Sequence, residues 1–141
     1  MRFICDAPGG KTWFGMETEA EADAESDLMR HAVARFYKRA RAEAIAHYAP
    51  PPSAPSIERD IGLKAHVERA MPRFATLRDE DGAGLATAML APPGPSRGSF
   101  RTIIVGPDNT DPFVAHADAI AALGAHFDFD LDPETCYPYR R

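Results

Sequence analysis

Apolar residues recur along this chain with two different spacings, one typical of strands and the other of helices. Two short aromatic and β-branched runs, RFIC and TWFGMET, flank the turn sequence DAPGGK and predict a hairpin near residues 2–18. The run RFATLRDEDGAGLATAML predicts a second hairpin over 73–90, with Asp81 and Gly82 at its tip. The run FRTIIVG, residues 100–106, predicts a buried strand.

The segment from Thr18 to Tyr48 has helical spacing. Thr18 and Glu21 form a capping box, and no proline or glycine follows before Tyr48. We therefore expect one uninterrupted helix of about 30 residues and about 45 Å. Its apolar stripe, placed at about 100° per residue, consists of Met29, Val33, Phe36, Tyr37, Ala40, Ala44 and Tyr48.

The remaining segments are shorter. The sequence APPPSAPS, residues 49–56, ends the long helix and predicts an extended connector within one domain. SIERDIG, residues 56–62, is a candidate strand, and LKAHVERAM predicts a short helix ending before Pro72. A last helix is expected from Pro112 to Phe127, with Asp111 as its cap, and the tail after it is expected to be irregular.

This order of elements predicts an α+β fold in a single domain spanning 1–141. Closely spaced strands favour antiparallel pairing, because parallel crossovers would need longer connections. We expect an antiparallel sheet of about five strands, packed by the one long helix and the C-terminal helix.

Composition adds an expectation about assembly. Alanine supplies 25 of the 141 residues, while Leu, Ile, Val and Phe together supply only 26. The net charge is −5, and eight Phe, four Tyr and one Trp are available as core residues. A folded domain with a modest core is expected. Self-association, most simply as a homodimer, would add burial that the monomer lacks.

The long helical segment separates its charges. Acidic residues occupy its first half and basic residues its second, an order that suits the helix dipole. The basic residues spread around most of the helix, whereas a nucleic-acid surface would gather them on one ridge. We interpret them as a solvated face and expect no nucleic-acid binding. An alternative is a charge-complementary partner, such as a second copy running antiparallel.

Candidate chemistry is sparse. The five histidines are His31, His47, His66, His116 and His126, and none has the close spacing of a zinc motif. His47 is expected to be partly buried near the apolar stripe. Lys11 follows two glycines, but the residues after it resemble a strand, which argues against a phosphate loop. No metal or other cofactor is predicted.

The best local candidate site is VGPDNTDPFVAH, where a strand ends and a helix begins. Its candidate ligand-binding residues are Asp108, Asn109, Asp111 and His116. The carboxylates disfavour a phosphate and suit a cation or a hydroxylated ligand. The structural alternative is that Asp108 and Asn109 form the turn while Asp111 caps the helix.

Two classes of function follow. The first is a self-associating interaction or regulatory module, and the second is a small-ligand-binding protein or enzyme using residues 105–116. No apolar run is long enough to span a membrane, and the start has no apolar core of a secretion signal. Together with an Arg- and Ala-rich composition, this predicts a bacterial cytoplasmic protein. Cys5 and Cys136 are expected to be unpaired thiols, with a disulfide between them as the alternative.

Overall fold

The computed structural model describes residues 1–93 and 101–136, and the α+β class predicted from the sequence is confirmed. Within these residues, five strands form one antiparallel sheet in the order β1-β2-β3-β4-β5. The strands are β1 (Arg2–Ala7), β2 (Lys11–Gly15), β3 (Arg73–Arg78), β4 (Gly84–Leu90) and β5 (Ile103–Val105). The helices are α1 (Glu19–Met29), α2 (Val33–Ala46), α3 (Ser56–Ala70) and α4 (Phe113–Phe127), and the single-turn helix η2 is Pro107–Asn109.

Both predicted hairpins are present. Gly9 and Gly10 adopt positive φ in the turn between β1 and β2, a conformation that glycine adopts without strain. In the second hairpin, Asp79 Oδ1 accepts backbone hydrogen bonds from Asp81 and Ala83, both at 2.9 Å, and so closes the turn. The predicted strand near residue 104 is β5, which pairs with β4.

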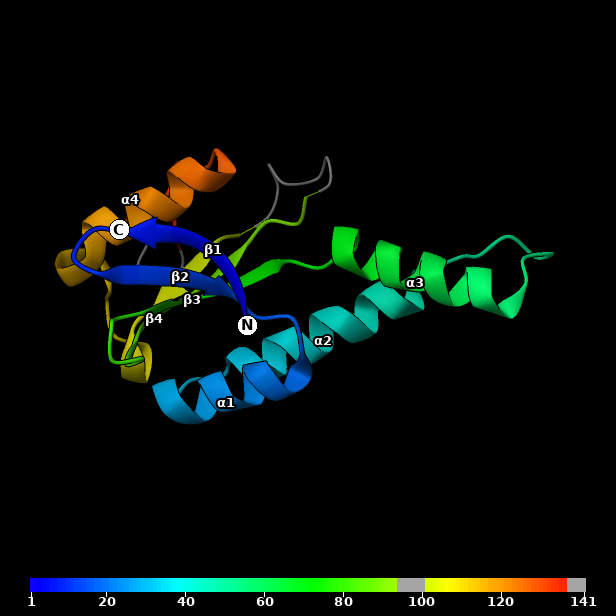
Figure 1. Cartoon of the computed structure of the whole chain (residues 1–141), viewed down its shortest axis with the longest axis horizontal. Coiled ribbons are helices and arrows are strands. Elements are labelled where there is room, and N and C mark those ends of the chain that lie inside the picture. The colour runs from blue at the N-terminus through cyan, green and yellow to red at the C-terminus, as the bar shows by residue number, and fades with distance from the viewer. Residues whose placement is uncertain (94–100, 137–141) are drawn as a thin grey trace.

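The two faces of the sheet are covered by different helices, with α4 on one side and α1 and α2 on the other (Figure 1). Under α4, Trp13, Leu77 and Ile120 are fully buried, and Trp13 Nε1 donates a 2.7 Å hydrogen bond to the backbone oxygen of Ala119. A separate apolar cluster lies under α1 and α2 and includes Met16, Ala22, Val33, Tyr37, Met71 and Phe74.

The prediction of one uninterrupted helix from Thr18 to Tyr48 is wrong. The chain turns at Arg30, which has a left-handed φ of 54°, and α2 then runs back alongside α1 (Figure 1). The backbone N–H groups of Arg30 and His31 both donate to the carbonyl of Ser26. The Ser26 hydroxyl accepts a 2.8 Å hydrogen bond from the N–H of Ala34, so it caps α2 from the end of α1.

This turn pairs the segregated charges within one chain. Lys38 of α2 lies 2.7 Å from Asp23 of α1, and Arg41 lies 3.8 Å from Glu19. The acidic partners of Lys38 and Arg41, which the alternative expected from a second copy, are therefore supplied by α1 of the same chain. The basic residues of α2 are solvated, as expected. Phe36, assigned to the buried stripe, is instead partly exposed, and the Arg35 guanidinium lies 5.7 Å from its ring centre.

A second correction concerns residues 56–70, which form the continuous helix α3 rather than a strand and a short helix. The half-buried Leu63 and Val67 face inward, while Ile57 and Ile61 are exposed. Gly62 lies mid-helix because the Tyr48 hydroxyl occupies that space, 2.2 Å from where a Cβ would stand. We call α3, with the end of α2 and the connector between them, the arm, because it projects from the sheet (Figure 1).

A buried polar network attaches α1 to the sheet. Glu25 of α1 is fully buried and forms an ion pair with Arg78 of β3. Its other carboxylate oxygen accepts a 2.6 Å hydrogen bond from the Thr87 hydroxyl of β4, and Arg78 Nε also donates to Thr76 at 3.0 Å. The buried Glu25 carboxylate is therefore paired and hydrogen-bonded through both of its oxygens, as a buried charge requires.

Replacing Glu25 by alanine should be strongly destabilising, because Arg78 would lose the carboxylate that balances its largely buried charge. We expect Glu25→Ala to lower the free energy of unfolding by about 3–5 kcal/mol, measured by urea denaturation. Glu43→Ala is the control, since Glu43 and Arg39 form an exposed pair at 3.5 Å, and its cost should be below about 1 kcal/mol. Equal losses in the two variants would contradict the structural role of Glu25.

Candidate functional site

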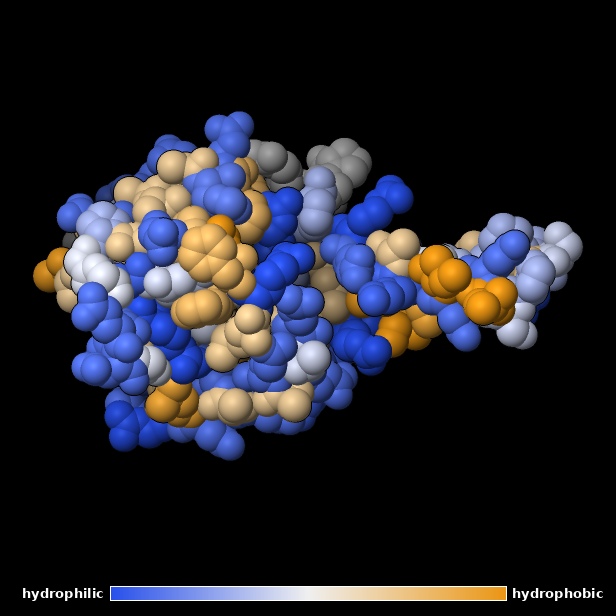
Figure 2. All heavy atoms as spheres, viewed as in Figure 1, coloured by the Kyte–Doolittle hydropathy of each residue, from blue (hydrophilic) through white to orange (hydrophobic). Residues whose placement is uncertain are grey.

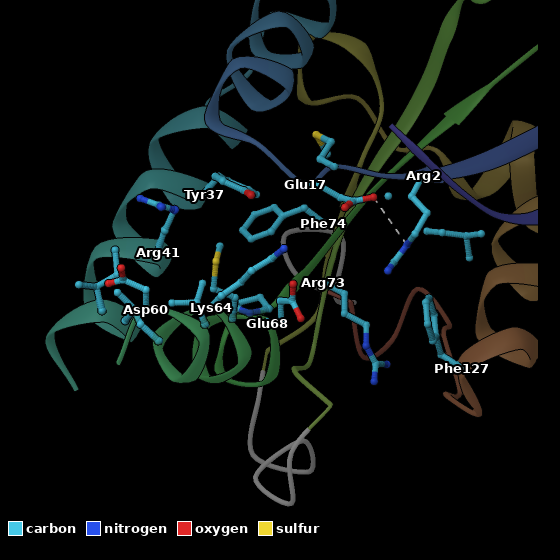
Figure 3. Close-up of a pocket in the computed structure, with 18 residues that line it drawn as sticks. Arg2, Glu17, Tyr37, Arg41, Asp60, Lys64, Glu68, Arg73, Phe74 and Phe127 are labelled. Atoms are coloured by element: carbon cyan, nitrogen blue, oxygen red, sulfur yellow. Dashed lines mark ion pairs between the residues drawn. The ribbon is translucent and has the colours of Figure 1, made fainter. Parts of the chain in front are cut away.

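An open groove of about 510 Å³ separates the arm from the edge of the sheet. This volume lies in the range of about 300–1,000 Å³ that small-molecule pockets occupy. Apolar side chains from several elements line it, including Met16, Tyr37, Val67, Met71 and Phe74. Charged side chains also line it, the bases being Arg2, Arg41, Lys64 and Arg73 and the acids Glu17, Asp60 and Glu68 (Figure 3).

Tyr37 is the most buried polar side chain of the groove. Only 4% of the residue is exposed, and its ring packs against Phe74 with the ring centres 5.0 Å apart. Its hydroxyl is directed into the groove and has no hydrogen-bond partner among residues 1–93 and 101–136 (Figure 3). Burial raises the pKa of Tyr37, so the phenol stays protonated and remains a hydrogen-bond donor at neutral pH.

The charged groups of the groove differ in how they are engaged. Arg2 lies 3.8 Å from Glu17, and Arg41 reaches out of the groove to Glu19, also at 3.8 Å. The Arg73 guanidinium stands over the Phe127 ring, 4.5 Å from its centre. Within the described chain, no ion pair engages the Lys64 ammonium. Lys64 therefore remains able to meet an anion.

A smaller cleft of about 70 Å³ lies at the start of α2 and has room for only about two water molecules. Phe36, Met89 and Val105 form much of its wall, with His31, Thr87 and Asn109 as its polar members. Its size excludes a drug-sized ligand.

His31 continues the buried network from Glu25. Because the Thr87 hydroxyl donates to Glu25, its oxygen is left to accept from His31 Nε2, which lies 2.8 Å away. His31 Nδ1 accepts from the N–H of Val33 at 3.4 Å. These partners assign a neutral ring with its proton on Nε2, and burial lowers the pKa of His31. Both ring nitrogens are occupied, so His31 holds the turn at Arg30 to β4.

The four residues predicted as a ligand site have separate partners. Asp108 forms an ion pair with Arg30, and both Asp108 and Asn109 adopt positive φ in η2. Asp111 Oδ1 accepts a 2.8 Å hydrogen bond from the N–H of Phe113, so the Asp111 side chain caps α4 as expected, although the helix begins at Phe113 and Pro112 occupies the N-cap position. His116 Nδ1 lies 3.1 Å from Lys11 Nζ, and Asn109 lines the small cleft. Ligand binding by these residues stays a prediction.

The other histidines contact neighbouring side chains or backbone. His47 is exposed rather than partly buried, and its Nδ1 lies 2.7 Å from the carbonyl oxygen of Glu43. His66 packs against Tyr48 with ring centres 5.4 Å apart, and its buried Nε2 has no partner in the described part of the chain. His126 packs edge-on against Phe127. Across residues 1–93 and 101–136, no three His, Cys, Asp or Glu side chains gather in a possible metal site.

Cys5 and Cys136 are free thiols, so the alternative of a disulfide between them is wrong. Burial raises the pKa of Cys5, and it raises the pKa of Cys136 to about 11. A thiol with a raised pKa carries little of the reactive thiolate at neutral pH. Neither cysteine therefore has the electrostatic setting of a nucleophile.

Sequence reasoning missed the groove. The sequence places Tyr37 in the apolar stripe of a long helix and gives Lys64 no role. Both residues line the groove only because α2 and α3 pack against each other, and the sequence carries no local signal for that arrangement.

Comparison with protein-family models, curated proteins and solved structures finds no match for this chain. No described helix is both long enough and apolar enough to cross a membrane.

Stability should decrease as the pH falls from about 7.5 to about 5.5. The pKa values of His31 and His116 are lowered in the folded protein. The unfolded chain therefore binds protons first on acidification, and the stability present above the ordinary histidine pKa of about 6.5 is lost below it. Urea denaturation across this range should show a smaller decrease for His31→Asn than for His47→Asn, the exposed control. A free energy of unfolding that increased on acidification would contradict the lowered pKa values of His31 and His116 in the folded protein.

Proposed function

We propose that this protein is an interaction or regulatory module that works as a homodimer in a bacterial cytoplasm, joined through α3 of the arm. The observation that carries this proposal is the exposure of α3, a 15-residue helix in which no residue is buried. The two unpaired thiols suit a reducing compartment.

The exposed surface of α3 carries two large apolar side chains among its charged residues. Ile57 is 70% exposed and Ile61 is 65% exposed, and their four-residue spacing places them on one side of the helix. Strongly hydrophobic side chains are visible on the arm in Figure 2. Burying such a side chain contributes roughly 1.5–3 kcal/mol. In a symmetric dimer both isoleucines of each copy would be buried in the interface, which doubles this contribution.

A second copy is the occupant that the charges of α3 favour. The helix carries the acids Glu58, Asp60 and Glu68 and the bases Arg59, Lys64 and Arg69, so its net charge is zero while the chain carries −5. Asp60, Lys64 and Glu68 line the groove, so Glu58, Arg59 and Arg69 are the charges that α3 keeps outside it. Both signs of charge are therefore available to a second copy beside Ile57 and Ile61.

The alternative of a ligand site at residues 105–116 has less support. Asp108 already has Arg30 as a partner, and Asp111 already caps α4. A ligand there would have to compete with both interactions.

Charging the exposed face of α3 should separate the dimer. We expect sedimentation equilibrium to give a dimer for the unchanged protein at micromolar concentration and a monomer for Ile61→Glu, because the interface would bury one unpaired carboxylate from each copy. Val114→Glu is the matched control, since Val114 is 87% exposed on α4, away from the arm. A strictly monomeric unchanged protein, or a dimeric Ile61→Glu variant, would refute the proposal. Circular dichroism would verify that both variants fold.

A further inference from the structure

The groove presents an unusual pair of hydrogen-bond donors on an apolar wall. The Tyr37 side chain is almost completely buried, and its hydroxyl opens into the groove without a hydrogen-bond partner among the residues that the structure describes. Lys64 approaches from α3, and Figure 3 shows its ammonium directed toward the middle of the groove, as the Tyr37 hydroxyl is. Both groups donate, so together they favour an acceptor.

The charges that line the groove balance once their ion pairs are counted. Arg2 is engaged by Glu17, and Arg41 by Glu19 outside the groove, which leaves Lys64 and Arg73 beside Asp60 and Glu68. The ligand is therefore selected by the two donors rather than by net charge. A carboxylate has two oxygens that accept hydrogen bonds, one for Tyr37 and one for Lys64.

The wall beside these donors is suited to hydrocarbon. Met71 and Phe74 are almost completely buried by the protein's own packing, and Val67 and Leu63 extend the apolar surface along α3. A ligand there would keep its apolar part on these side chains and its charged end at the donors. Small-molecule sites commonly combine an apolar lining with a few convergent polar groups.

We propose that the groove binds a small amphipathic carboxylate, such as a medium-chain fatty acid. Its carboxylate accepts hydrogen bonds from Tyr37 and Lys64, and its hydrocarbon chain lies on Val67, Met71 and Phe74. This site is separate from the exposed face of α3, because Ile57 and Ile61 do not line the groove.

Decanoate is the probe, and isothermal titration calorimetry with the full chain is the measurement. We expect decanoate to bind and Tyr37→Phe to bind it about tenfold more weakly, which corresponds to the loss of one hydrogen bond to a charged group. Lys64→Met should weaken binding by a similar factor. Tyr48→Phe and Lys38→Met are the matched controls, because neither residue lines the groove, and both should bind decanoate as the unchanged protein does.

Decyltrimethylammonium tests the sign of the charge, since it carries a positive head group on the same alkyl chain. It should bind at least about tenfold more weakly than decanoate, because its head group would face Lys64. Equal binding of the two probes, no binding of decanoate, or unchanged affinity in Tyr37→Phe would each overturn the proposal.

A stability measurement distinguishes the proposed donor from an ordinary buried phenol. Tyr37→Phe keeps the ring against Phe74 and removes only a hydroxyl that has no partner in the described chain, so thermal denaturation without ligand should show no loss of stability. A marked loss would mean that the hydroxyl bonds within the protein, which would overturn its assignment to a ligand.

Discussion

A carboxylate buried beneath α1 determines how the helices lie on the sheet. Glu25 is balanced by Arg78 of β3 and Thr87 of β4, and Thr87 in turn contacts His31 on the far side of the turn at Arg30. Both ends of this turn are therefore tied to the same region of the sheet. Because an uncompensated buried charge is costly, α1 cannot move away without its polar partners, and α2 is held to run back beside it.

The turn at Arg30 also determines which charges are paired within the chain and which side chains remain exposed. Lys38 and Arg41 meet acids of α1, so much of the charge segregation of this segment is balanced within one chain. On the outer side of α3, Ile57 and Ile61 remain exposed. Its inner side bounds the groove that holds Tyr37 and Lys64. One helix thus separates the side that carries Ile57 and Ile61, where we propose that a second copy binds, from the groove, where we propose that a carboxylate binds.

The elements predicted correctly are those specified by neighbouring residues. The turn at Asp81 and Gly82 and the cap of α4 by Asp111 follow from local backbone chemistry. The turn at Arg30 has no such signal, because a left-handed arginine is uncommon and its partners Asp108 and Thr87 are far away in the sequence. The sequence predicts a strand and a short helix where the structure has the single helix α3, and Gly62 within it makes room for Tyr48. The groove likewise combines distant segments.

The three helices α1, α2 and α3 leave the sheet after β2 and return to it at β3, its immediate neighbour. The two ends of this excursion are joined at its base, where the N–H of Met16 donates a 2.9 Å hydrogen bond to the carbonyl of Phe74. The arm, which lies beyond the buried Glu25 network of this excursion, can be lengthened, shortened or exchanged while the strands keep their register. The arm could therefore diverge faster than the sheet, so that one scaffold would carry different recognition elements in different descendants.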